Sequence, residues 1–562
     1  MSEFFRIFAF LFFVKMQMIG WCKKQIISFA AFLVFAQLSV LCFASPLISR
    51  DTIPCDTISC VTISCDSIPC EFRFADTIYP SVSLLKYQVD IFDTSDEGTP
   101  SSFSDLYSDA PGIFTFRGNA FREAPFVGHI DGRPDTISVD WVFTTGYDGR
   151  PTNYGVWGGG TGWSGQPLYV HWPDSIVQRF RNESHALTKA FSSEEIIVGS
   201  LASRIYFIDY ATGDSSRRSL PTDNTIKGTI SLDPTLNGNL YVGQGIPCKR
   251  PFGALTFNLF KHARTHFFPQ DRNAWRSWGA YDSSPIRVGN FLFRPGENGT
   301  LYKFLILGDT LRLHSTLRFK KPSSSKAAGM EASMAFYQNR GFVSDNHGNI
   351  LCFNLVTMQP IWCYNNHDDS DGSPVLAIEE GRPYLYSACQ VDKQGSAGTC
   401  YFVKLDAEDG SLVWQQTFSC RRAYFEGKTF DGGQFATSLK GLGNCDSLIF
   451  TNIVTNSKVN GKGKTGLYGD FVAISRKDGR IHYRTTLKHY AWSSPVALLN
   501  DDGEMFIFTA DTKGRIYLID ALTGKILYDS KIGDNFESSP IVIDNHIILG
   551  SRGRKIYKLT IK

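Results

Sequence analysis

One pattern recurs from about residue 138 to the C-terminus, at intervals of roughly 40–60 residues. Each copy opens with small or hydroxyl residues before a short apolar strand, and continues as strand, glycine turn, strand, turn and strand. The eight openings begin at Gly165, Gly228, Ser283, Ala332, Gly372, Gln434, Ser493 and Ser538. This period, with many short strands at even spacing, is typical of the blades of a β-propeller.

The strands and turns inside each copy support the same fold. Residues 402–405 and 516–519 are almost continuously apolar, as expected when both faces of a sheet are covered. The turns at Asp209, Asp406 and Asp520 supply a side chain that can bond the turn backbone, followed by a glycine suited to positive φ. No long window has a helical period. We therefore predict an all-β fold, an eight-bladed β-propeller of four-stranded antiparallel blades.

The last copy ends after three strands, which leaves one strand missing from the ring. Residues 137–145 resemble an outer strand and precede the first inner strand, so we expect this N-terminal strand to close the ring and remove its free edges. An aromatic residue follows the turn in several copies, although Met358 replaces the turn glycine in one of them. We expect these aromatic side chains to have a structural role, docking within the propeller. They are Trp141, Trp362, Trp414, Tyr483 and Tyr528.

The chain before the repeats divides into two further segments. Within residues 1–44, Lys23 and Lys24 precede an apolar run with a small-residue end, which is typical of a signal peptide or a membrane anchor. Residues 45–111 are rich in Cys, Thr, Ser and Asp, and are expected to form a low-complexity linker before a propeller of residues 112–562. A recurrent Asp-Thr/Ser-Ile resembles a bacterial O-glycosylation pattern, although repeat expansion explains it equally. The acceptors would be Thr52, Thr57, Ser67 and Thr77.

Thirteen cysteines are consistent with an oxidising compartment. Cys352 and Cys363 flank one predicted turn symmetrically, and Cys389 and Cys400 flank a longer loop. Opposed cysteines on antiparallel strands can reach disulfide distance. We predict two disulfides, with small buried apolar side chains as the alternative.

Charge and blade position indicate the kind of ligand site. Lysine and arginine number 57 against 54 acidic residues, a net charge of +3, and the absence of a long basic stripe excludes nucleic acid as the main partner. Residues before the blade openings should form a ring at the channel mouth, beside the Gly-rich residues 155–167. The ring either binds a ligand or is a solvated mouth. The Gly-rich residues either grip a ligand or form a plug packed into the channel. The candidates are Trp157, Trp163, Asp282, Glu331, Asp371, Trp492 and Glu537.

No metal site is expected from the sequence. Residues 367–372 (HDDSDG) lack the alternating ligands and the later glutamate of an EF-hand. His262 and His266 have helical metal-ligand spacing, but no third ligand lies nearby.

The arrangement D-x-x-x-G-x-x-x-W from Asp406 to Trp414, its relative from Asp520 to Tyr528, and the recurrent SSP openings resemble the pyrroloquinoline-quinone (PQQ) propeller superfamily. This superfamily includes quinoprotein alcohol dehydrogenases and an outer-membrane assembly lipoprotein that shares the propeller without the chemistry. In the dehydrogenases the resemblance implies a channel quinone beside a disulfide of adjacent cysteines, a calcium ion and a catalytic aspartate. No two cysteines are adjacent here, and no CxxCH haem motif occurs. The chain is therefore closer to the assembly-factor type.

We expect an exported, periplasmic or extracellular, monomeric and non-catalytic scaffold. It would need no cofactor, and would bind a protein or glycan partner in the cell envelope, with membrane association only through the N-terminal segment. The alternatives are a quinone- or metal-dependent oxidoreductase, using PQQ and calcium, and a sensor of a small ligand or polymer.

Overall fold

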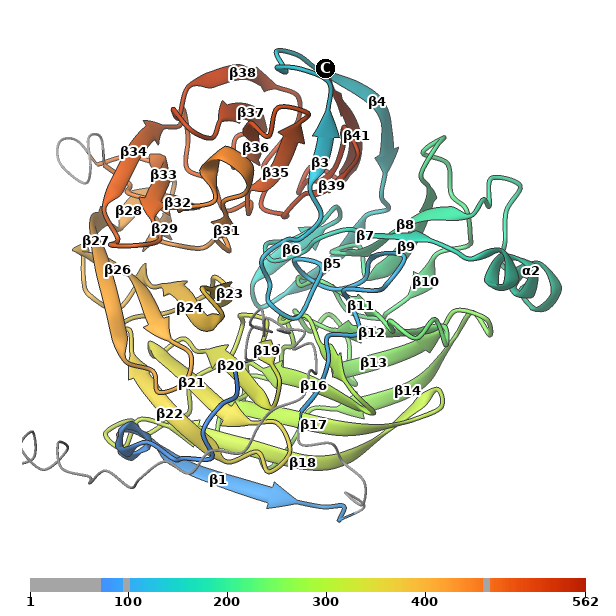
Figure 1. The fold of residues 1–562 in the computed structure, drawn as a ribbon. Coiled ribbons are helices and arrows are strands. Elements are labelled where there is room, and N and C mark those ends of the chain that lie inside the picture. Colours follow the sequence, from blue (N-terminus) through green and yellow to red (C-terminus); the bar gives the residue numbers. More distant parts are fainter. Residues whose placement is uncertain (1–71, 95–101, 458–464) are drawn as a thin grey trace, which may run out of the picture. The chain divides into compact units, whose positions relative to one another are not determined.

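The computed structural model describes residues 72–94, 102–457 and 465–562, all within one compact unit. Their strands form eight antiparallel sheets arranged as blades around a common centre (Figure 1). The predicted eight-bladed β-propeller is confirmed. Each predicted opening leads into the inner strand of one blade, which we number 1 to 8 in chain order.

The first four blades each contain four strands. From the centre outward, blade 1 has β7 (Leu168–His171), β8 (Glu194–Ser200), β9 (Arg204–Asp209) and β10 (Leu220–Pro221); blade 2 has β11 (Ser231–Leu232), β12 (Asn239–Gly243), β13 (Gly253–Asn258) and β14 (Ala263–Pro269); blade 3 has β15 (Ile286–Val288), β16 (Phe291–Gly296), β17 (Thr300–Leu307) and β18 (Thr310–Lys320); blade 4 has β19 (Ala335–Tyr337), β20 (Arg340–Ser344), β21 (Asn349–Asn354) and β22 (Pro360–Asn365).

The other four blades follow the same plan. Blade 5 has β23 (Val375–Glu379), β24 (Arg382–Ala388), β26 (Ala397–Asp406) and β27 (Leu412–Arg421); blade 6 has β31 (Leu439–Lys440), β32 (Leu448–Val454), β33 (Gly469–Ser475) and β34 (Ile481–Thr486); blade 7 has β35 (Val496–Asn500), β36 (Met505–Ala510), β37 (Arg515–Asp520) and β38 (Ile526–Lys531); blade 8 has β39 (Ile541–Ile543), β40 (His546–Gly550), β41 (Lys555–Ile561) and β4 (Ile137–Thr144).

Short elements extend or connect the blades. They are β1 (Lys86–Ile91), β2 (Gly112–Ile113), β3 (Gly128–Ile130), β5 (Asp148–Thr152), β6 (Gly155–Gly158), β25 (Gln390–Val391), β28 (Ala423–Phe425), β29 (Lys428–Phe430), β30 (Gly432–Gly433), the helix α2 (Asp174–Glu183) and the 3-10 turns η1 (Pro80–Leu84) and η2 (Gly443–Cys445). No helix in the described part of the chain is long and apolar enough to cross a membrane.

Blade 8 is completed by the N-terminal strand, as predicted. β4 pairs antiparallel with β41, with Val142 opposite Tyr557 and Thr144 opposite Lys555. The N-terminal strand and the C-terminal strand are thereby joined by backbone hydrogen bonds within one blade, so the ring has no open end at this position.

The aromatic residues after the turns lie between adjacent blades. The Trp362 Nε1–H donates to Ala407 O of blade 5 at 3.1 Å, and its ring lies against Gly410, where a Cβ atom would approach within 2.6 Å. The other four aromatic side chains also donate to backbone carbonyls of the next blade: Trp141 to Tyr210, Trp414 to Arg476, Tyr483 to Ala521 and Tyr528 to Ile137. Met358 has a φ of +61°. This turn therefore has the same left-handed backbone conformation as the others, although methionine stands in place of glycine.

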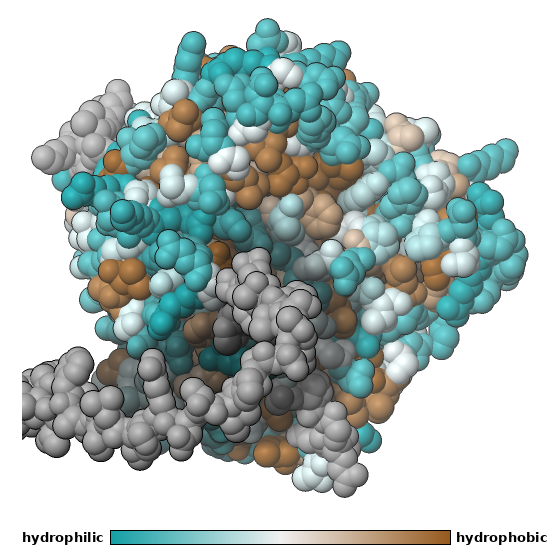
Figure 2. Space-filling model, viewed as in Figure 1, coloured by the Kyte–Doolittle hydropathy of each residue, from teal (hydrophilic) through white to brown (hydrophobic). Residues whose placement is uncertain are grey.

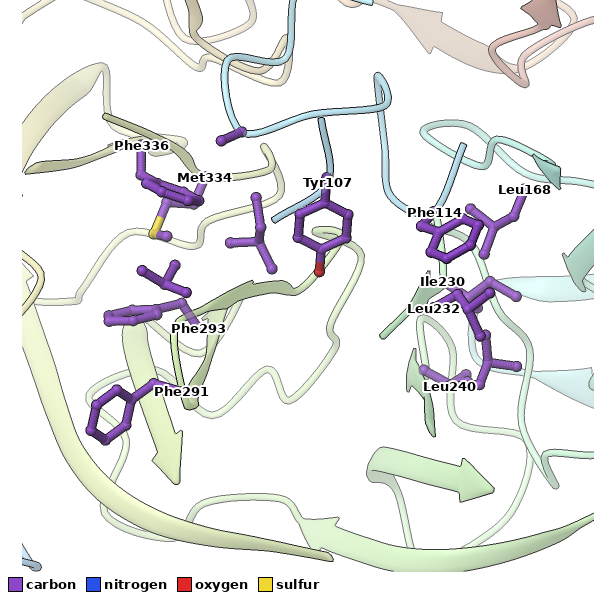
Figure 3. Packing of buried hydrophobic residues seen from close by; sticks show 14 of the residues in the cluster. Tyr107, Phe114, Leu168, Ile230, Leu232, Leu240, Phe291, Phe293, Met334 and Phe336 are labelled. Carbon is purple, nitrogen blue, oxygen red and sulfur yellow. The ribbon is translucent and has the colours of Figure 1, made fainter. Parts of the chain in front are cut away.

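We predicted that residues 45–111 form a linker outside the fold, and this prediction is wrong for the described residues of the segment. β1 adds to the outer edge of blade 3, with Val89 opposite Leu317 on β18. Tyr107 is fully buried, and Figure 3 shows its ring between Phe293 and Met334 on one side and Ile230 on the other. The physical reason is that this segment carries apolar side chains that cover blade edges. Residues 1–71, with the predicted signal or anchor, lie outside the described residues.

Most large apolar side chains of the described residues are packed between neighbouring blades. Figure 2 shows a largely hydrophilic face with smaller hydrophobic patches. The exposed apolar side chains include Tyr424 and Phe425, which are 76% and 47% exposed on the β28–β29 hairpin.

The predicted disulfides are not formed, because every cysteine in the described residues is a free thiol. A β-bulge after Cys352 places this residue opposite Trp362, and Cys363 opposite Leu351. The Cys352 and Cys363 side chains therefore enter different core clusters. Cys389 and Cys400 are neighbours, but their thiols interact by a hydrogen bond, and burial is the main cause that raises the pKa of Cys400.

Candidate functional site

A ring of hydroxyl side chains surrounds the centre of the propeller. In five steps, a backbone N–H donates to the hydroxyl of the next blade at 2.9–3.2 Å: Ser284 to Ser333, Ser333 to Ser373, Ser373 to Thr437, Thr437 to Ser494, and Ser494 to Ser539. Ser539 then donates through its N–H to Gly165 O of blade 1 at 2.9 Å. The recurrent serine of the blade openings is therefore a hydrogen-bonded contact between blades.

Residues 112–130, which we call the internal segment, contact all eight blades; Figure 1 shows part of this segment in blue within the ring. β2 pairs with β7 of blade 1, and β3 runs parallel to β35 of blade 7. Between them, backbone carbonyls of the segment accept from inner strands of other blades. The remaining contacts are Phe114 O with Leu232 N, Phe116 N with Ser284 Oγ, Ala120 O with Phe336 N, Phe121 O with Leu376 N, Arg117 with Ser438 O, and His129 N with Asp544 O.

Two fully buried arginines anchor the internal segment inside the ring. Arg117 donates to Pro495 O at 2.7 Å and to Ser438 O at 3.2 Å. Arg122 donates to Met334 O at 2.8 Å and to Phe116 O at 2.7 Å. Burial lowers the pKa of Arg117 to about 9 and that of Arg122 to about 10. Carbonyl oxygens rather than carboxylates thus stabilise both guanidinium groups, and the channel centre is filled by the chain itself.

Four of the seven candidate mouth residues meet around a small cavity in the ring. Trp163, Glu331, Asp371 and Trp492 line it together with Phe435. The cavity measures about 10 Å³, which is about the space that one water molecule needs. The rings of Phe435 and Trp492 stack on each other with their centroids 4.9 Å apart. These aromatic faces therefore pack against each other, which leaves almost no free space at the mouth.

Beside this cavity, Asp282, Glu297 and Glu331 form a carboxylate cluster whose oxygens lie within 4.8 Å of one another. The ammonium of Lys227 forms an ion pair with Asp282 and lies 3.7 Å from Glu331. Burial opposes a charge on Lys227, but the nearby carboxylates more than offset it and hold the pKa of Lys227 well above its usual value. Burial, with Glu331 and Asp282, raises the pKa of Glu297.

Asp369 and Asp371 extend the carboxylate cluster toward blade 5. Burial is the main cause that raises the pKa of Asp369 to about 7; Lys393 opposes this shift and Glu331 adds to it. Burial and the neighbouring Asp369 raise the pKa of Asp371, which accepts a hydrogen bond from Gln390. The mouth therefore holds carboxyl groups that keep protons at pH values where exposed carboxyls are ionised.

Trp157 and Glu537 lie together beside Arg552 in a second group. The Arg552 guanidinium lies 5.0 Å from the centre of the Trp157 ring and 3.3 Å from a Glu537 carboxylate oxygen. Asn535 also donates to Glu537 at 2.7 Å. The seven candidates thus divide between the cavity with its carboxylate cluster and this group.

The channel residues do not fit the quinone and calcium that the resemblance implies in dehydrogenases. The mouth cavity of about 10 Å³ is far too small for a tricyclic quinone, and the sequence has no adjacent cysteines to pack beside one. Lys227 already supplies the positive charge among the carboxylates, so a calcium ion would have to displace it.

Lys227 is the main functional residue that sequence reasoning missed. It stands directly before the opening at Gly228, as Asp282, Glu331 and Asp371 stand before theirs, and this shared position was a usable signal. In blade 6 the structurally equivalent residue is Phe435, which stands two residues before Thr437 of the hydroxyl ring as Asp371 stands two residues before Ser373. No comparable signal identified Glu297 or the two buried arginines.

The predicted glycosylation acceptors lie mostly outside the described residues, which include only Thr77. Thr77 is exposed. His262, which was not expected to bind metal, lies in the turn before β14, and His266 lies within β14. Burial lowers the pKa of both.

Comparison with known proteins identifies the repeat type. Residues 467–562 match the family model described as "Outer membrane protein assembly factor BamB", and no curated protein matches the chain. A europium-containing methanol dehydrogenase is similar with a TM-score of 0.54 and 11% identity, over 81% of this chain and 99% of that one.

Two further solved structures are similar to parts of the chain. A quinohemoprotein alcohol dehydrogenase from Comamonas testosteroni has a TM-score of 0.54 and 12% identity, over 81% of this chain and 82% of that one. BamB from Moraxella catarrhalis has a TM-score of 0.45 and 14% identity, over 67% and 97%. At these identities the likeness establishes the fold alone. The protein is thus an eight-bladed β-propeller built from quinoprotein-like repeats.

Proposed function

We propose that the protein is an exported, non-catalytic scaffold of the cell envelope that binds a protein or glycan partner on its outer surfaces. The observation that carries the proposal is the internal segment, which contacts every blade and fills the channel centre. In the quinoprotein dehydrogenases that the chain resembles, this channel is expected to hold the reactive centre. The family-model match over residues 467–562, described as an outer-membrane assembly factor, supports the same class.

The β28–β29 hairpin is a suitable contact for a protein partner. Tyr424 and Phe425 at its tip expose 76% and 47% of their surface, and aromatic residues are enriched at the energetic centres of interfaces. The hairpin lies outside the blade sheets. Substitutions here are therefore expected to leave the propeller intact.

The first test asks whether the channel accepts a quinone. Full-length protein purified from its own host is incubated with calcium and pyrroloquinoline quinone, then examined by native mass spectrometry and absorption. We expect no stoichiometric adduct. An adduct that forms one-to-one and is lost in Trp163→Ala would overturn the non-catalytic proposal in favour of an oxidoreductase.

The second test concerns the partner. Crosslinking in intact cells, followed by mass spectrometry, should give one reproducible envelope partner that the double variant Tyr424→Ser/Phe425→Ser loses. Leu412→Ser, which alters an exposed apolar residue on β27, is the matched control and should retain it. Equal crosslinking in both variants would rule out the hairpin as the contact.

A further inference from the structure

A large open groove lies between blades 2 and 3, and its lining residues differ from those of the mouth cavity. It is covered by the connection from β14 to β15, residues 270–279, and has a volume of about 1460 Å³. Small-molecule sites usually measure about 300–1,000 Å³. The groove therefore has room for several linked rings.

Its lining is strongly cationic. Arg250, Arg272, Arg276, Arg318 and Lys326 line the groove with a single carboxylate, Asp271. Arg318 is neutralised by Asp90 and, at 3.3 Å, by Asp271, whereas no ion pair with another described residue occupies the other four. The Nη1 atom of Arg276 is buried without a hydrogen-bond partner among the described residues. Four cations of the lining therefore have no counter-charge among the described residues.

Two tryptophans supply flat apolar surfaces beside these cations. Trp275 and Trp278 both line the groove. The Trp278 Nε1–H donates to Glu297 at 2.7 Å, and its ring packs edge-on against Tyr154 with centroids 5.2 Å apart. Lys320 lies 5.8 Å from the centre of the Trp275 ring. Aromatic rings held in this way can pack against the apolar faces of sugar rings.

The loop that carries these residues is held in place by hydrogen bonds. Gln270 donates to Ser277 O at 2.5 Å, and the Asn273 N–H donates to Asp271 at 2.8 Å. The Arg276 N–H donates to Asn298 O at 3.2 Å. The site is therefore formed before any ligand arrives, which lowers the cost of binding.

We propose that this groove binds an acidic oligosaccharide. Its anionic groups pair with Arg272, Arg276 and Lys326, and its sugar rings lie on Trp275 and Trp278. The cations are concentrated in one cavity rather than spread along a face, which favours a short chain of rings over a nucleic acid or a flat protein surface. This inference deepens the proposed function and rests on it in one respect, the glycan class of partner.

The test uses titration calorimetry on the full-length protein. The probes are oligogalacturonate, a sulfated oligosaccharide, a neutral malto-oligosaccharide and an oligoglutamate peptide. We expect at least one acidic oligosaccharide to bind, with affinity that falls as salt rises, while the neutral sugar does not bind and the peptide binds at least about tenfold more weakly. The two acidic sugars distinguish carboxylate from sulfate recognition.

Variants locate the binding. Arg272→Gln/Arg276→Gln and Trp275→Ala should each weaken binding at least about tenfold, whereas Arg480→Gln, at an arginine 87% exposed in another blade, should not change it. Absence of binding by both acidic sugars, peptide binding of equal strength, or unchanged affinity in the double variant overturns the proposal. None of these outcomes affects the quinone test, so the two proposals fail separately.

Discussion

The channel mouth and the groove between blades 2 and 3 both combine tryptophans with charged side chains, but they balance charge differently. At the mouth, Lys227 lies among Asp282 and Glu331, and Phe435 and Trp492 pack on each other. In the groove, Arg272, Arg276 and Lys326 have no carboxylate partner among the described residues and line an open volume of about 1460 Å³. Charges compensated within the fold contribute to stability, whereas uncompensated charges on an open surface remain available to a ligand.

Removing the compensating charge at the mouth should have the largest effect. Lys227→Met leaves Asp282, Glu297 and Glu331 without a counter-charge in a buried place, and should lower the free energy of unfolding by about 3–5 kcal/mol. Chemical denaturation at pH 7 measures it. Lys326→Met in the groove is the control and should change stability by less than about 0.5 kcal/mol. Similar losses in both variants would contradict the comparison.

The buried carboxyls should make stability depend on pH. Burial raises the pKa of Asp369 from 3.8 to about 7, so the folded protein keeps a proton between about pH 4 and pH 7 that the unfolded chain has lost. The contribution of Asp369 to stability therefore falls as pH rises through this window. A shift of about three pKa units corresponds to about 4 kcal/mol, so Asp369→Asn/Asp371→Asn should remove a pH-dependent change of this order, measured by denaturation at a series of pH values. The same pH dependence in the wild type and in the double variant would refute the assignment.

The hydroxyl ring should show a smaller effect. Ser373→Ala removes the acceptor of the Ser333 N–H and leaves a buried donor unpaired, which should lower the free energy of unfolding by about 1–3 kcal/mol. Ser325→Ala, in an exposed loop, is the matched control. If the two variants unfold alike, the ring contributes nothing measurable.

The smallest effect on stability is expected in the groove. Arg276→Gln removes a cation that has no ion-pair partner among the described residues, so the free energy of unfolding should stay within about 0.5 kcal/mol of the parent protein. Thermal unfolding at low and high salt measures this change. A marked loss would show that Arg276 supports the fold instead of remaining free for a ligand.

The blade architecture was predictable because its signals are local and repeated. Each opening from Gly165 to Ser538 combines a small or polar start with a short apolar strand, and the closing strand carries Trp141 at the expected place. The first disulfide was predicted from an assumed symmetric hairpin, but Cys352 lies opposite Trp362 and Cys363 opposite Leu351, and a register difference of one residue places side chains on opposite faces. Cys389 and Cys400 do come together, but as free thiols.

The channel filling and the groove could not be read from the chain in the same way. Arg117 contacts Pro495 across 378 positions, and the groove joins Phe92, Arg250, the loop at Arg272 and Lys326. Such sites depend on how blades pack, and a single sequence contains no local pattern that records this packing. Lys227 is the exception, since its place before a blade opening marked it.

The internal segment also constrains the order in which the molecule can be completed. It lies near the start of the chain, yet its partners include β35 and the turn at Asp544 near the end. Contacts across such sequence distances form slowly, because long loops must close first. During synthesis the internal segment lacks its final partners until the last blades have been synthesised. The centre of the ring can therefore pack completely only after the C-terminal residues have folded. A chain truncated at the C-terminus would leave its core exposed to proteases and to other molecules.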